Sequence, residues 1–117
     1  INATNQESIK IKILKIKKTF SFLETYLNFK IVYDYDKLRP FEKGLGGSLI
    51  YSNDKNTIGF SVDFRDRYFS VYWLDNKNYD IDNFWEIGEQ IGSGMTTEKE
   101  LIHVKRQVDA RIRYYNR

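Results

Sequence analysis

Three short segments with the alternation of β-strands follow one another in the middle of the chain, and they constrain the fold more than any other feature. Residues 57 to 64 alternate large apolar side chains with small or polar ones, as a strand with one buried and one wet face does. Residues 48 to 52 and 68 to 74 are further strand candidates, and the residues between the candidates favour turns. The pattern predicts an antiparallel β-meander.

An amphipathic helix is predicted at each end of the chain. Apolar residues recur every three or four positions from Ile9 to Leu27, which predicts a first helix over about residues 7 to 28. The Ile and Lys alternation of residues 9 to 13 also fits a strand, but the helical stripe is longer. Near the other end, residues 97 to 100 form a capping box, and apolar residues then recur at helical spacing through to the carboxyl end.

Two further elements are predicted around the meander. Residues 30 to 35 are rich in β-branched and aromatic side chains and fit either a fourth strand or an extended segment before Pro40. A short helix capped by Asp82 is expected before the last helix, ended by a mobile joint at residues 92 to 94. Its apolar residues are Phe84, Trp85, Ile87 and Ile91.

The length and composition fit one α+β domain over residues 1–117, with a meander of three to four strands between its helices. A chain of 117 residues suffices for one core, and 16% aromatic residues argue against disorder. Cysteine is absent, so disulfides, thiolate zinc sites and cysteine nucleophiles are excluded. No apolar run approaches the ~20 residues of a membrane span. We expect a soluble protein without membrane contact, and the cytoplasm as its location.

Charge is distributed unevenly along the chain. Residues 1–18 and 95–117 together hold eleven basic and four acidic residues, so these ends carry +7, and the formal net charge of +3 leaves −4 for residues 19–94. Such asymmetry favours charged partners but does not identify them.

The acidic and aromatic stretch from residue 73 to residue 86 is the predicted surface for a protein partner. Aromatic anchors ringed by carboxylates suit the capture of a basic protein. The alternative is that the rings of this stretch fill the core, which is the commoner fate of large aromatic side chains. The partner-binding set is Trp73, Asp75, Asp80, Asp82, Trp85 and Glu86.

Nucleic-acid binding by the last helix is the alternative function. Basic side chains spaced along this helix can contact phosphates from one side, although a solvated basic helix face is the commoner explanation. No helix-turn-helix pair, RNA-binding sheet motif or zinc finger accompanies them. The set consists of Lys105, Arg106, Arg113 and Arg117.

Catalytic and metal-binding patterns are weak, so we predict a non-enzymatic protein without a cofactor. His103 is the only histidine and is expected on the helix surface. Asp63 and Asp66 suit a charged hairpin tip better than a metal site, because nothing forces the two carboxylates together. Residues 44 to 47 are rich in glycine but precede a strand, where a phosphate cradle precedes a helix.

The order helix, meander, helix resembles small uncharacterised bacterial α+β proteins, some of which neutralise toxins. The residues that carry the resemblance are 20–24, 29–30 and 58–66, and it spans about residues 18 to 75. It implies an immunity-type protein that covers a toxin's active site, and the −4 middle would suit a basic nuclease toxin. It brings no catalytic residues with it.

Overall fold

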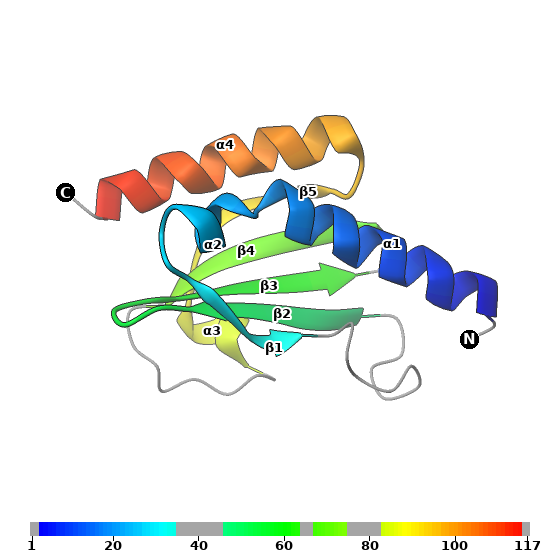
Figure 1. Ribbon diagram of the computed structural model, residues 1–117, viewed down its shortest axis with the longest axis horizontal. Helices are drawn as coiled ribbons and strands as arrows, with labels where there is room; N and C mark the ends of the chain where they lie inside the picture. The colour runs from blue at the N-terminus through cyan, green and yellow to red at the C-terminus, as the bar shows by residue number, and fades with distance from the viewer. Residues whose placement is uncertain (1–2, 35–45, 64–66, 75–82, 116–117) are drawn as a thin grey trace.

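The computed structural model describes residues 3–34, 46–63, 67–74 and 83–115, without the side chains of residues 3–9 and 46 (Figure 1). Five strands form one sheet in the order β1-β2-β3-β4-β5, and each neighbouring pair is antiparallel. The predicted meander is therefore confirmed and has one strand more than expected. The strands are β1 (Lys30–Asp34), β2 (Gly46–Ser52), β3 (Thr57–Asp63), β4 (Tyr68–Leu74) and β5 (Glu89–Met95).

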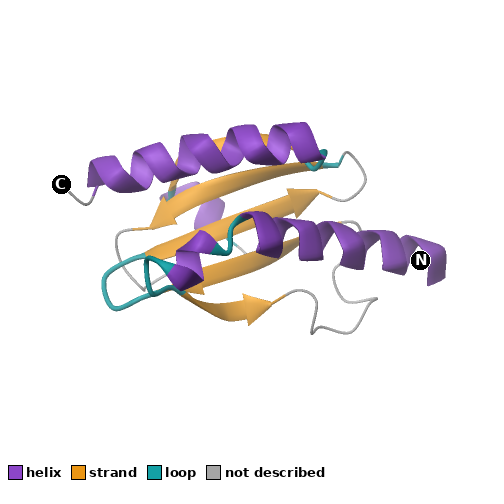
Figure 2. Cartoon of the chain, turned by 45° about the horizontal axis from the view of Figure 1, so that its top comes forward, coloured by secondary structure: helices purple, strands orange, loops and turns teal. Residues whose placement is uncertain are grey.

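Four helices complete the α+β fold, and they divide unequally between the two faces of the sheet. Figures 1 and 2 show α1, α2 and α4 over one face of the sheet and α3 on the other. A salt bridge of 2.8 Å between Lys17 and Asp34 connects α1 to β1. The helices are α1 (Ala3–Thr19), α2 (Phe22–Thr25), α3 (Phe84–Ile87) and α4 (Glu98–Tyr115).

The main core fills the space between the sheet and the layer of α1, α2 and α4. Phe20 at the end of α1 packs edge-on against Phe60 of β3, with ring centroids 4.9 Å apart. Phe60 also stacks on Phe69 of the next strand at 6.4 Å. From α4, four side chains at helical spacing enter the same core, as the capping box and stripe predicted: Leu101, Val104, Val108 and Ile112.

The opposite face of the sheet has a much smaller apolar cluster, in which Phe84 of α3 packs against Ile50 and Leu74. Gly59 lies directly beneath this ring, because a Cβ built on it would be 2.5 Å from Phe84 Cε2. Beside the cluster, one serine from each of four strands stands in register across the sheet: Ser48, Ser61, Ser70 and Ser93.

The prediction that residue 91 belongs to a helix ended by a mobile joint at residues 92–94 is wrong. The helix α3 ends at Ile87, and residues 89–95 form the edge strand β5. Gly92 and Gly94 lie in this strand because α4 packs closely on it: a Cβ on Gly94 would be 2.8 Å from Val104 Cγ2. The glycines therefore allow a helix to approach a strand. The Asp82 cap lies outside the described residues.

The first helix is shorter than the predicted span of residues 7 to 28. The chain turns at Phe20 and Ser21, and α2 adds only one more turn. Asn28 then has a φ of 58°, in the left-handed region that ends helical structure. The predicted apolar stripe nevertheless identifies the core-facing side, because Ile13, Ile16 and Leu23 are buried.

Candidate binding groove between α2 and α4

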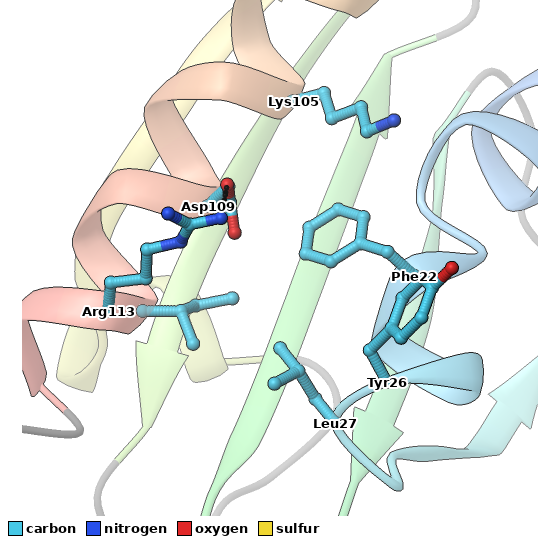
Figure 3. A pocket seen from close by; sticks show the side chains of 7 residues that line it. Phe22, Tyr26, Leu27, Lys105, Asp109 and Arg113 are labelled. Carbon is cyan, nitrogen blue, oxygen red and sulfur yellow. Dashed lines mark ion pairs between the residues drawn. The ribbon is translucent and has the colours of Figure 1, made fainter.

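A groove of about 510 Å³ lies between α2 with its following residues and the carboxyl-terminal half of α4 (Figure 3). It forms because α2 is a single turn, too short to cover the flank of the longer α4. Its lining residues are Phe22, Tyr26, Leu27, Lys105, Asp109, Ile112 and Arg113.

The lining of the groove is largely apolar. Ile112 is buried, whereas Phe22 and Leu27 are half-buried and pack against the main core from its margin. Tyr26 stands beside Phe22 with 80% of its surface exposed. An aromatic side chain with so little packing contributes almost nothing to the fold, so Tyr26 is available to a partner.

Charged side chains of α4 form the other wall of the groove. The Lys105 ammonium lies 5.7 Å from the centroid of the Phe22 ring, within the range of a cation–π interaction. Arg113 makes an ion pair of 3.2 Å with Asp109, one helical turn earlier. Both Arg113 and Lys105 are exposed, so the groove has one net positive charge at its rim.

The structure brings together part of the basic set predicted for nucleic acid. Lys105 and Arg113 both line the groove, and Arg106 is exposed next to Lys105 on α4. Arg117 lies outside the described residues. Since Asp109 offsets the charge of Arg113, the cluster is less positive than the sequence suggested.

The acidic and aromatic set predicted for a protein partner is only partly assembled. Trp73 is 4% exposed and stacks on Tyr115 with centroids 4.9 Å apart, so it belongs to the core and not to a binding surface. Trp85 is 40% exposed on α3 and Glu86 is exposed beside it. The three aspartates of the set, Asp75, Asp80 and Asp82, lie outside the described residues.

The fold does not strengthen the catalytic and metal-binding patterns that were weak in the sequence. His103 is exposed on α4, as predicted. Asp63 ends β3 half-buried, while its proposed companion Asp66 lies outside the described residues, as do Gly44 and Leu45. Within the described part of the chain, no three His, Asp or Glu side chains gather where they would hold a metal ion.

Sequence reasoning did not single out Phe22 and Tyr26, although a signal was present. Both residues fall off the apolar stripe that contains Phe20, Leu23 and Leu27, and they are four positions apart. Two aromatic residues on the polar side of a predicted helix are a sign of an exposed contact surface.

Comparison with protein-family models, with curated proteins and with solved structures gives no match. The resemblance to toxin-immunity proteins therefore stays a prediction. The class that the structure establishes is an α+β protein with a five-stranded antiparallel meander. Among the described helices, none combines the length and the apolar character needed to cross a membrane.

Proposed function

We propose that this chain is a non-enzymatic protein-binding module and that the groove between α2 and α4 receives a side chain of its partner. The observation that carries the proposal is the apolar groove itself, with the exposed Tyr26 ring at its rim. Aromatic residues beside a pocket, surrounded by charged groups, are typical of the residues that dominate binding energy at protein interfaces.

The chemistry of the groove specifies the complementary segment. Phe22, Leu27 and Ile112 suit an aliphatic or aromatic side chain. Lys105 and Arg113 at the rim suit a carboxylate next to that side chain, because an interfacial charge pair speeds association and selects the partner. The partner segment is therefore an apolar residue flanked by Asp or Glu.

The proposal is tested by capture from a lysate of the source cells with matched variants. Tyr26→Ala removes the exposed ring of the groove, and Tyr68→Ala removes another exposed tyrosine, from strand β4. Wild type and Tyr68→Ala should recover the same protein with and without nuclease, and Tyr26→Ala should lose it. Equal recovery by all three would place the binding surface elsewhere.

A toxin-neutralising role through the acidic and aromatic surface is a finer form of the same function. One observation favours it, because Trp85 and Ile87 of α3 are 40% and 57% exposed and flank the exposed Glu86. A partner on this surface would be basic. Binding that is lost with Trp85→Ala but kept with Tyr26→Ala would support this role over the groove.

Nucleic-acid binding is the second candidate function, because the groove combines the Phe22 and Tyr26 rings with the cations Lys105 and Arg113. Rings can stack on bases while cations contact phosphates. Asp109 in the same groove opposes this function by repelling phosphate. The test is the affinity for single-stranded DNA at low and high salt, with Arg106→Glu and Arg113→Glu as variants. Absence of binding at low salt would exclude it.

A further inference from the structure

The two edges of the sheet differ in how they are protected from further strand pairing. The edge strand β1 is five residues long, begins with Lys30 and has an irregular register against β2. Short length, lysine and bulges all hinder pairing with another strand. The other edge strand, β5, is seven residues long and contains neither lysine, arginine nor proline.

The one charged residue of β5 already has hydrogen-bond partners within the chain. Glu89, at the start of the strand, accepts hydrogen bonds from Arg111 and Tyr115 of α4. Each edge strand has one extra residue against its neighbour, Val32 in β1 and Ile91 in β5, and Ile91 is buried in the main core. The two edges therefore differ in length and in lysine content, and not in the presence of a bulge. No described strand pairs with the outer side of β5, which leaves a row of backbone donors and acceptors there.

A groove of about 490 Å³ follows this edge between β5 and α4. Its strand side is made by residues 90–93, and its helix side by Gln107, Ala110 and Arg111. The small Ala110 leaves room in the helix wall. The Arg111 guanidinium is paired with Glu89, and the other groups that line the groove are uncharged.

Packing of α4 decides which occupant fits. Val104 and Val108 lie so close over the strand that a Cβ on Gly92 would be 3.1 and 3.0 Å from them, so α4 sits directly above β5. Antiparallel pairing of β5 with β5 of a second copy would place two such helices about one strand spacing apart, roughly 4.8 Å. Packed helices need about 8–10 Å. The edge therefore excludes a second copy in this arrangement and accepts a strand that has no helix above it.

We propose that the outer edge of β5 binds an extended peptide segment of a partner protein by β-strand addition, with uncharged side chains of that segment in the groove beside α4. Backbone hydrogen bonds would supply most of the affinity, and the groove would select alternate side chains. This site lies on the opposite flank of α4 from the groove that contains Tyr26. Binding at each of the two surfaces can therefore be tested, and disproved, separately.

The experiment selects peptides from a phage-displayed library of random linear sequences on the immobilised full chain. Ala110→Trp fills the groove beside β5, and Ile102→Trp adds the same ring at an exposed position of α4 that does not line it. Selected peptides should bind Ala110→Trp at least about tenfold more weakly than wild type and Ile102→Trp equally well. They should also slow amide hydrogen exchange in residues 90–93.

Three results would overturn the proposal. The first is recovery of no specific peptide, and the second is peptides that bind both variants alike or protect only residues of the α2–α4 groove. The third is a dimer in solution that Ala110→Trp dissociates, because it would show that a second copy occupies the edge. Folding of each variant is checked by circular dichroism, and Tyr26→Ala should leave peptide binding unchanged.

Discussion

The two faces of the sheet differ in composition and in packing. The helix-covered face is the one beneath α1, α2 and α4, and the opposite face carries only α3. The helix-covered face carries Phe60, Phe69 and Val71 and buries them under α1 and α4, whereas the opposite face carries a row of serines and one small cluster under α3. Burial of apolar side chains is the main source of stability for a domain of this size. The helix-covered face therefore maintains the fold.

The comparison also shows where functional surfaces arise on the helix-covered side. Phe60, Phe69 and Val71 are fully buried between the sheet and the helices, but packing is incomplete between α2 and α4, where Phe22 and Tyr26 remain accessible. A module can expose apolar side chains at such a margin because its stability comes from the layer beneath. Stability and binding are then separable by mutation.

The largest expected effect is on the helix-covered face. Phe60→Ala removes a fully buried ring that contacts Phe20 and Phe69, and should lower the free energy of unfolding by about 4 kcal/mol. Ser61→Ala, at the next position and on the opposite face, should change it by less than about 0.5 kcal/mol. Urea unfolding measures both. Similar losses would mean that the two faces do not differ in this way.

A second experiment tests how tightly the opposite face is packed beneath α3. Gly59→Ala places a methyl group 2.5 Å from the Phe84 ring and should cost about 2 kcal/mol. Phe84→Leu in the same chain should relieve part of this cost, which a double-mutant cycle would record as a coupling of about 1 kcal/mol. Additive losses would show that the ring and the glycine do not contact each other.

Tyr51 is a buried residue of the main core with an unsatisfied polar group. Its side chain is fully buried and its hydroxyl has no hydrogen-bond partner among the described residues. Tyr51→Phe should raise the free energy of unfolding by about 1 kcal/mol in thermal or urea unfolding at neutral pH. A loss of stability would reveal a partner for the hydroxyl.

The same residue predicts a dependence on alkaline pH. Burial, and then the carboxylates of Glu24 and Asp34, raise the pKa of Tyr51 above its ordinary value of 10.0. The unfolded chain therefore loses this proton first, and wild type should lose stability as the pH rises above about 10. Tyr51→Phe lacks this contribution, so its advantage over wild type should grow.

The smallest expected effect concerns a cluster of cations beside the helix layer. Burial, followed by Arg67 and Lys15, lowers the pKa of Lys12, so the folded state disfavours its charge. Lys12→Gln should stabilise the protein by roughly 0.3 kcal/mol at low salt and by less at high salt. Lys18→Gln, at an exposed position of α1, is the control. The advantage of Lys12→Gln over wild type should shrink as the pH rises toward 10.5, because the folded wild type loses the Lys12 proton first, and a constant difference would contradict this explanation.

Local signals in the sequence were sufficient for much of the fold. The capping box predicted α4 because it fixes a helix start by itself, and the alternation of residues 57–64 predicted β3. The turn at residues 53–56 was also predicted, and Asn53 Oδ1 accepts hydrogen bonds there from the backbone nitrogens of Lys55 and Asn56 at 3.0 and 2.9 Å.

The features that the sequence did not predict depend on contacts between distant residues. Gly92 and Gly94 suggested a break, because nothing nearby in the sequence shows that Val104 needs their space. The groove beside Phe22 likewise depends on where α4 lies relative to α2. The spacing of Lys105 and Arg113 indicated a shared side of a helix, but not the apolar groove next to it.

If a protein partner occupies the groove between α2 and α4, site-specific photocrosslinking from that groove should capture it. A benzophenone amino acid replaces Tyr26 in the groove or, in a matched sample, Trp85 on α3, and each chain is irradiated in its source cells. We expect one protein adduct at position 26 that Lys105→Glu abolishes. An adduct to nucleic acid at that position, or a protein adduct at position 85 alone, would contradict it.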